Sequence, residues 1–232
     1  MKKDVFGLYS LSLVALLSLL TSCGELFDAD EEKAGAVAAT VTLDRTEIDL
    51  MVGDEFRIGV TLKPDTLKNN AVFWESADTK VITFKTDTLQ AVGAGETTVT
   101  VSWPDQKVSA KATVNVLPVW QMTTTEYPYD MLIFASVTVN GRAADKDCIV
   151  AAFDSDENIR GVGQLRKDKD IDYMLLRIYS PDGESDNLLL RCYDRKRALV
   201  SETEVPITFS ANSLGTLSEL YKMAFKLFFN YG

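Results

Sequence analysis

The sequence contains no histidine and only three cysteines among its 232 residues. Without histidine, the chain cannot assemble a Ser-His-Asp or Cys-His catalytic group, and it cannot hold a metal ion through imidazole. A pair of carboxylates that cleaves glycosides needs no histidine, but nothing in the sequence marks such a pair among the 34 acidic residues. The sequence therefore predicts a protein that is not an enzyme and that carries no cofactor.

Basic charge is scarce as well. The chain has 24 Lys and Arg against 34 Asp and Glu, a net charge of −10, which becomes −11 when residues 1–22 are excluded. A chain this acidic repels nucleic acid and anionic lipid surfaces, so we expect no nucleic-acid partner. Hydrophobic residues make up 46% of the chain, enough for the cores of one large or two small domains.

The sequence also lacks an apolar run long enough to span a membrane. A helix needs about 20 apolar residues to cross a bilayer. The apolar stretch from Leu8 to Leu20 has 13 residues and follows Lys2 and Lys3, which is typical of a secretory signal. It ends in Leu20-Thr21-Ser22-Cys23, which resembles the lipobox of bacterial lipoproteins. The resemblance implies that residues 1–22 are a signal peptide and that Cys23 is lipidated. It also implies an outer membrane lipoprotein, attached to the membrane through a lipid anchor.

Residues 23–39 form a charged tether of small residues without a sustained period. The acidic cluster from Asp28 to Glu32 is similar to the signal that sends Bacteroidota lipoproteins to the outer face of the cell. In that signal the acidic residues directly follow the Cys, whereas here they are displaced. Exposure at the cell surface is therefore expected, with a periplasm-facing lipoprotein as the open alternative.

Residues 40–117 show short stretches of alternating polar and apolar residues separated by turns, which predict about seven strands of a sandwich. Their order resembles the bacterial Ig-like domain, group 2. The motifs that carry the resemblance are Leu50-Met51-Val52-Gly53-Asp54, Leu62-Lys63-Pro64, Trp74-Glu75-Ser76-Ala77-Asp78 and residues 91–101. A turn at residues 84–87 departs from the family pattern. The resemblance implies a spacer or adhesive module without catalytic residues, with Trp74 in the core.

Pro118 separates this segment from a second strand-rich segment, residues 119–232. Asn140-Gly141 is a strong hairpin signal, and the stretch from Tyr221 to Phe229 alternates with period 2. Met131 to Ala135, Ala152-Phe153 and Arg160-Gly161-Val162 resemble a domain of Bacteroidota extracellular proteins, which implies a β-sandwich without a defined activity. The predicted fold class is therefore all-β, with two tandem antiparallel β-sandwich domains behind a lipoprotein signal peptide.

A weak metal-site candidate lies in the second segment. Asp154, Asp156 and Asn158 match the first three ligand positions of a calcium-binding EF-hand loop. The later positions hold Ile159 and Leu165 instead of Gly and Glu, so a hairpin turn of solvated acids is favoured. Arg160 is expected to pair with these acids.

Three further groups of residues have a predicted role. Cys148 and Cys192 lie in predicted strands, where two buried thiols are favoured over a disulfide. The basic run Arg195-Lys196-Arg197 is expected to be a turn. Candidate sugar-stacking side chains are Trp103, Trp120, Tyr127 and Tyr129, although packing in a core or between domains is favoured for each.

The working hypothesis is a non-catalytic, lipid-anchored surface protein in which an Ig-like spacer presents a β-sandwich for adhesion or for a protein partner. The alternatives are a glycan-binding accessory lipoprotein and a structural subunit of an envelope complex. Exposed aromatic rings in a row would favour a glycan, and an uncovered edge strand would favour a protein partner.

Overall fold

The computed structural model describes residues 38–65, 71–122 and 127–226. The predicted signal peptide, Cys23 and nearly all of the tether lie outside the described residues. The described chain contains nineteen strands and one short 3-10 turn, Pro104–Gln106, so the all-β prediction is confirmed. No helix among these residues is long and apolar enough to cross a membrane.

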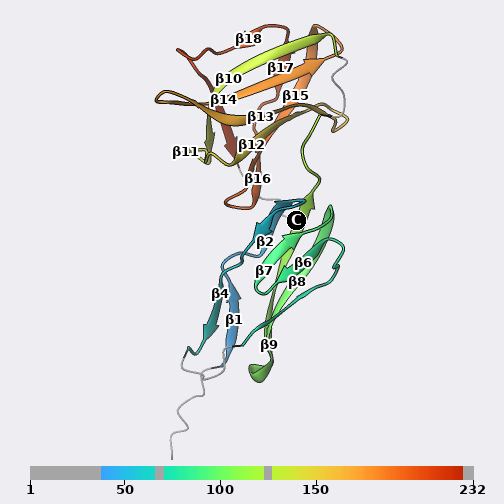
Figure 1. Cartoon of the computed structure of the whole chain (residues 1–232), viewed down its shortest axis with the longest axis vertical. Coiled ribbons are helices and arrows are strands. Elements are labelled where there is room, and N and C mark those ends of the chain that lie inside the picture. Colours follow the sequence, from blue (N-terminus) through green and yellow to red (C-terminus); the bar gives the residue numbers. More distant parts are fainter. Residues whose placement is uncertain (1–37, 66–70, 123–126, 227–232) are drawn as a thin grey trace, which may run out of the picture. The chain divides into compact units, whose positions relative to one another are not determined.

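The first nine strands form three sheets, here called the N-terminal sheets (Figure 1). A four-stranded sheet has the order β2-β9-β8-β5, a three-stranded sheet has the order β3-β7-β6, and β1 pairs with β4. All pairs are antiparallel except β2 with β9, which run parallel. The strands are β1 (Thr40–Leu43), β2 (Glu47–Met51), β3 (Glu55–Phe56), β4 (Val60–Lys63), β5 (Phe73–Ser76), β6 (Ile82–Lys85), β7 (Thr88–Ala91), β8 (Gly95–Trp103) and β9 (Val108–Leu117).

Alternation along the strands builds the core of the N-terminal sheets. In β8, every second residue from Thr97 to Trp103 is buried, while the residues between them are partly exposed. These side chains face one side of the sheet because successive residues of a strand point to opposite faces. Trp74 is half-buried against this core and stacks on Phe84, with 5.7 Å between ring centroids, in keeping with its expected structural role.

The remaining strands form one large sheet, here called the closed sheet (Figure 1). Its path runs β10-β14-β13-β12-β15-β16-β19, and β19 pairs with β10 to complete a ring. The strands are β10 (Tyr129–Val139), β11 (Arg142–Ala143), β12 (Cys148–Phe153), β13 (Ile159–Asp168), β14 (Ile171–Ser180), β15 (Glu184–Asp194), β16 (Leu199–Thr203), β17 (Ile207–Ser210), β18 (Ser213–Leu214) and β19 (Tyr221–Lys226).

The closing pair is parallel, with Ala135 opposite Tyr221 and Val139 opposite Phe225. β18 also runs parallel to β10, so the predicted antiparallel arrangement has exceptions in this half too. Closure gives β10 and β19 partners on both sides, which removes two sheet edges that would otherwise be exposed. The ring encloses a core of alternating apolar side chains that includes Ile133, Leu176 and Leu190. The second predicted β-sandwich is therefore a single sheet closed on itself, because β19 pairs with β10 instead of leaving two separate layers.

Local turn chemistry agrees with the sequence. Asn140 and Gly141 have φ angles of 50° and 74° and connect β10 to β11, as expected for a tight hairpin. The alternation predicted from Tyr221 onward is present in β19, where Met223 and Phe225 are buried between exposed residues. The part of that prediction beyond residue 226 lies outside the described residues.

The two groups of strands coincide with the segments predicted from the sequence. The described residues between 38 and 226 nevertheless form one compact unit. The boundaries 40–117 and 119–232 therefore stay a prediction, while the contacts that join the two groups are described below.

Candidate functional sites

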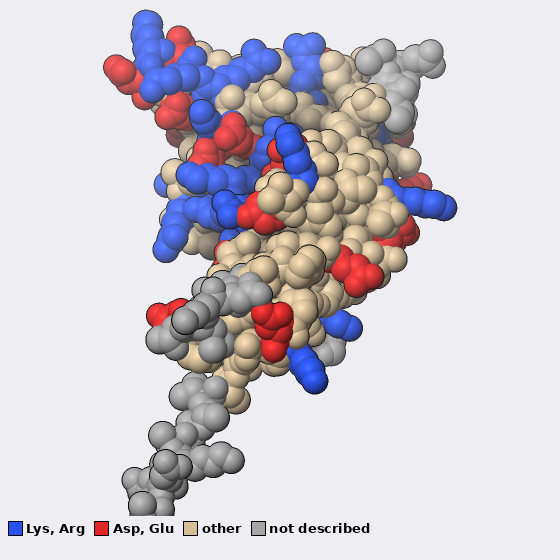
Figure 2. Space-filling model, turned by 60° about the horizontal axis from the view of Figure 1, so that its bottom comes forward, with Lys and Arg blue, Asp and Glu red and all other residues tan. Residues whose placement is uncertain are grey.

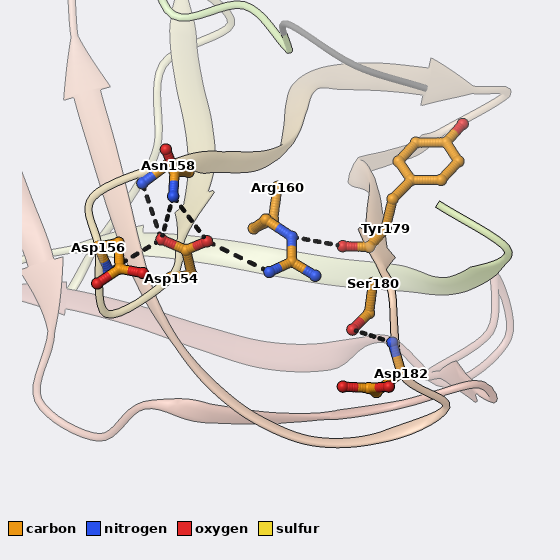
Figure 3. Close-up of polar contacts among 7 residues, drawn as sticks. All are labelled: Asp154, Asp156, Asn158, Arg160, Tyr179, Ser180 and Asp182. Carbon is orange, nitrogen blue, oxygen red and sulfur yellow. Dashed lines mark hydrogen bonds and ion pairs between the residues drawn. The ribbon is translucent and has the colours of Figure 1, made fainter. Parts of the chain in front are cut away.

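The acidic turn between β12 and β13 is organised around one carboxylate (Figure 3). The Oδ1 atom of Asp154 accepts hydrogen bonds from the backbone N–H groups of Asp156 at 3.0 Å and Asn158 at 2.8 Å. The side-chain amide of Asn158 donates to both carboxylate oxygens at 3.2 Å. Asp154 therefore holds the hairpin turn closed, which is the favoured interpretation of this motif.

Arg160 connects this turn to the neighbouring strand. Its Nη1 atom lies 3.3 Å from Oδ2 of Asp154, and its Nε donates to the carbonyl oxygen of Tyr179 at 2.9 Å (Figure 3). The guanidinium lies over the ring of Tyr127, 4.5 Å from the centroid. The predicted pairing of Arg160 with the acids of the turn is therefore present, in a position where the Arg160 side chain is almost fully buried.

Electrostatics favour the ionised form of Asp154. Burial raises its pKa, but hydrogen bonds from Asn158 and Arg160 outweigh burial, so the pKa lies below its ordinary value. No group of three His, Cys, Asp or Glu side chains converges anywhere in the described part of the chain. The oxygens of Asp154 accept N–H donors from its own turn and from Arg160.

A second cluster joins the N-terminal sheets to the closed sheet, and we call it the junction cluster: Met51, Trp120, Ala151, Phe153 and Tyr193. The ring of Trp120 meets Phe153 edge-on at 5.4 Å between centroids and Tyr193 at 6.4 Å. Ala151, Phe153 and Tyr193 lie on the outer face of the closed sheet, since their neighbours along the strands belong to its interior core. The junction cluster therefore covers apolar surface that a separate closed sheet would expose.

Polar contacts surround the junction cluster. The hydroxyl of Tyr193 donates to Oδ2 of Asp54 at 2.5 Å, and Nε of Arg195 lies 3.0 Å from Oδ1 of the same carboxylate. Burial and this hydrogen bond raise the pKa of Tyr193, so its hydroxyl stays a donor at neutral pH. Asp54 thus satisfies a buried hydroxyl and a cation from the other half of the chain.

The turn between β15 and β16 extends these contacts. Ala198 is fully buried and belongs to the core of the N-terminal sheets, and its carbonyl oxygen accepts the backbone N–H of Asp49 at 2.8 Å. The carboxylate of Asp49 accepts the backbone N–H of Val200 at 3.0 Å. Nη1 of Arg45 donates to the carbonyl oxygen of Arg197 at 2.5 Å. Backbone groups of both halves are therefore hydrogen-bonded to each other.

The basic run Arg195-Lys196-Arg197 forms this turn, as predicted, and its charges are paired. Besides the contact of Arg195 with Asp54, Nζ of Lys196 lies 3.3 Å from Asp145 and Nη1 of Arg197 lies 2.7 Å from Asp194. The sequence did not indicate that this turn contacts β2. A turn with three cations in an acidic chain was the one signal that could have prompted a search for acidic partners.

The four aromatic candidates for sugar stacking do not share a surface. Trp103 is 0% exposed and Trp120 is 7% exposed, so neither ring can stack on a sugar; both pack in apolar clusters, which is the interpretation the sequence favours. Tyr127 is half-buried beneath Arg160, and only Tyr129, at 43%, is exposed. The preferred interpretation of Trp120, packing between the two segments, agrees with the junction cluster.

Cys148 and Cys192 are both free and buried in the core of the closed sheet. Val150 lies opposite Cys192, and Cys148 lies two residues away along β12, so the two cysteines are neighbours on the same face of the sheet. The neighbouring Cys148 thiol and burial raise the pKa of Cys192, which favours its neutral form. The structure thus has the two buried thiols that the sequence favours.

Charged side chains of both signs lie together on one face of the molecule (Figure 2). On the face shown in Figure 2, basic and acidic side chains lie next to each other, beside a broad area without charge. Among the described ion pairs, Arg191 pairs with Glu157 and, at 2.5 Å, with Glu202. These carboxylates raise the pKa of Arg191, whose guanidinium also lies 4.6 Å from the ring centroid of Phe153.

Comparison with known proteins identifies no family. No protein-family model matches the sequence, and no curated protein is significantly similar to it. Among solved structures, domains 1–6 of the surface layer protein SbsC match with a TM-score of 0.29 and 18% identity over 74% of this chain and 25% of that one. Domains 5–6 of the same protein match with a TM-score of 0.28 and 13% identity over 74% and 96% of the two chains.

This chain thus spans about a quarter of the first of these structures. TM-scores this low do not establish a common fold, so the matches indicate no function for this chain.

Proposed function

We propose that this chain is a lipid-anchored protein of the bacterial cell envelope, exposed at the cell surface and without catalytic activity. The N-terminal sheets act as an Ig-like spacer of group 2, and the closed sheet is the domain that they hold away from the membrane. Cys23 carries the anchor, and the acidic tether of residues 23–39 connects it to the β-strands.

The observation that carries this proposal is the junction between the two halves. A spacer transmits position only if its connection to the presented domain is stiff, and a linker of small polar residues alone would bend freely. Here the connection after β9 includes the buried ring of Trp120, and backbone and side-chain hydrogen bonds join Asp49 and Asp54 to the closed sheet. This arrangement suits a protein that holds a domain in position and does not catalyse a reaction.

An exposed strand edge supports a protein partner over a glycan. β5 is the last strand of its four-stranded sheet, and its first residue, Phe73, is 64% exposed. Among the described residues, no strand pairs with its outer edge. Such an edge can accept an added strand from another chain, with Phe73 as an apolar contact beside the new backbone hydrogen bonds.

Lipidation is tested by metabolic labelling of the bacterial host with a palmitate analogue. We expect label on the wild-type chain and none on the Cys23→Ala variant, because the thiol is the attachment point. A Cys192→Ala variant is the matched control and should be labelled like the wild type, since its thiol is buried. Undiminished labelling of Cys23→Ala would refute the anchor.

Partner binding is tested separately by capture from envelope extracts and on a glycan array, with residues 23–232 carrying Cys23→Ser as bait. Capture of a single envelope protein that is lost in Phe73→Asp supports the proposed edge contact. Retention on neutral glycans without any protein partner would support the alternative of a glycan-binding accessory lipoprotein.

A further inference from the structure

A pocket of about 290 Å³ opens at one end of the closed sheet. It lies between the turn that joins β10 to β11 and the turn that joins β15 to β16. Val139 and Leu199 supply apolar walls, and Arg142, Asp194, Arg197 and Ser201 supply polar groups. This volume is at the lower end of the range for small-molecule sites, so the pocket suits a ligand the size of a single sugar ring.

Ser201 is the observation that points to a ligand. Its side chain lines the pocket and the residue is only 1% exposed, yet its Oγ atom has no hydrogen-bond partner in the described part of the chain. Leaving a buried hydroxyl unpaired is unfavourable, because the group has lost its hydrogen bonds to water. A hydroxyl of a bound molecule would form a hydrogen bond with Ser201, whereas the apolar side chains of the pocket cannot.

Charge identifies the chemistry of that molecule. Asp194 is almost fully buried, and its carboxylate accepts the backbone N–H of Arg197 at 3.0 Å and the Nη1 of Arg197 at 2.7 Å. Arg142 is exposed at the same pocket and forms no ion pair with any described residue. The pocket is therefore lined by two cations and one anion in a chain whose net charge is −10.

The remaining hydrogen-bonding capacity favours hydroxyl groups beside the charge. Each carboxylate oxygen has two acceptor sites, so Asp194 can accept a further hydroxyl while it binds Arg197. Arg142 can hold a carboxylate through two parallel N–H donors. The apolar side chains of Val139 and Leu199 can contact the C–H groups of a ring.

We propose that this pocket binds a small polyhydroxylated carboxylate of the uronic acid class. The carboxylate pairs with Arg142, and ring hydroxyls pair with Ser201 and Asp194. This proposal goes beyond the display function and does not depend on it, because neither the anchor nor the β5 edge contributes to the pocket.

Saturation-transfer NMR and titration calorimetry test the proposal on residues 23–232 carrying Cys23→Ser. The probes are D-glucuronate and D-galacturonate, with D-glucose and D-galactose as neutral counterparts of the same ring shapes. We expect the acids to bind and the neutral sugars to bind at least tenfold more weakly, since they lack the group that pairs with Arg142. A methyl glucuronide distinguishes a chain end from the free sugar, because it binds only if the anomeric oxygen points out of the pocket.

Two variants locate the site. Arg142→Gln should weaken glucuronate binding at least tenfold, whereas Arg166→Gln, an exposed arginine outside the pocket, should leave it unchanged. Ser201→Ala should weaken binding while unfolding at the same or a higher temperature, since it removes an unpaired buried hydroxyl. Equal binding of acids and neutral sugars, binding that survives Arg142→Gln, or no binding at millimolar concentration would overturn the proposal. If nothing binds, the hydroxyl of Ser201 pairs with an ordered water molecule instead.

Discussion

At the scale of single residues, Asp154 shows how a carboxylate shapes a turn. Its two oxygens accept N–H groups from Asp156, Asn158 and Arg160 within one short hairpin. A carboxylate with several N–H donors is stabilised in its ionised form, which is why its pKa lies below the ordinary value of 3.8. The motif that resembles the start of a calcium loop is a hairpin turn whose N–H groups bind the Asp154 carboxylate.

Replacing Asp154 with alanine should lower the free energy of unfolding by about 2 kcal/mol at neutral pH, because several N–H donors lose a charged acceptor. The control Asp156→Ala should change stability little, since the turn uses only its backbone N–H. Urea unfolding measures both. An equal loss in the two variants would contradict this role of Asp154.

The pH dependence of the same variant has a definite sign. A carboxylate whose pKa is lower in the folded state stabilises the protein above its unfolded pKa, and this contribution is lost as pH falls through the folded value. The gap in stability between the wild type and Asp154→Ala should therefore narrow below about pH 4. Chelation with EDTA should leave the unfolding temperature unchanged, and a marked decrease would indicate a calcium site after all.

The two buried thiols lead to a second prediction at this scale. In residues 23–232 carrying Cys23→Ser, Cys148 and Cys192 should not react with an aromatic disulfide reagent while the protein is folded, because both are buried and the pKa of Cys192 is raised. Both should react once the protein is unfolded without reductant. Failure to titrate any thiol after unfolding would show that Cys148 and Cys192 form a disulfide instead.

At the scale of elements, β13 depends on two glycines where it passes close to β14. A Cβ atom at Gly161 would lie 2.2 Å from the carbonyl oxygen of Arg177, and one at Gly163 would lie 2.7 Å from that of Leu175. The obstacle in each case is backbone, which cannot rotate away. In the Arg160-Gly161-Val162 motif, Arg160 is thus a buried cation, and Gly161 allows β13 to lie close to the backbone of β14.

Gly161→Ala should therefore cost about 1–3 kcal/mol of stability, because the two strands must separate to admit a methyl group. Gly183→Ala is the matched control: its Cβ would lie 3.3 Å from the ring of the exposed Tyr129, which can move aside. Chemical denaturation of the two variants gives the comparison. If Gly161→Ala leaves stability unchanged, β13 and β14 are further apart at this position than the structure indicates.

At the scale of the whole molecule, the junction cluster couples the two groups of strands. Trp120, Phe153 and Tyr193 pack across the connection, and Asp49 and Asp54 add hydrogen bonds to it. Large aromatic side chains contribute most of the apolar area in such contacts. Stability of one half should therefore depend on the other.

Trp120→Ala should lower stability by about 3–5 kcal/mol and split thermal unfolding into two transitions in a calorimeter. The wild type should show one transition, because the halves lose their contact when either unfolds. Phe73→Ala, which removes an exposed ring, should leave the single transition in place. Two well-separated transitions in the wild type would show that the junction cluster does not couple the halves.

Much of the architecture could be predicted from the sequence because it depends on local patterns. Alternation of polar and apolar residues marks β8 and β19, and Asn140-Gly141 marks its hairpin, since side-chain direction and turn geometry are properties of neighbouring residues. The absence of histidine excluded whole classes of chemistry. The hairpin interpretation of Asp154 and the turn at Arg195 also followed from residue types.

The tertiary structure alone decided how distant segments meet. The parallel pairing of β19 with β10 closes the sheet through backbone hydrogen bonds. Almost every residue type can form such bonds, so the pattern of side chains does not predict which strand will be the partner. Burial of Trp120 and the contact of the β15–β16 turn with β2 depend in the same way on distant surfaces. The pocket at Ser201 exists only because closure brings the ends of β10 and β16 together around a hydroxyl that finds no partner in the described chain.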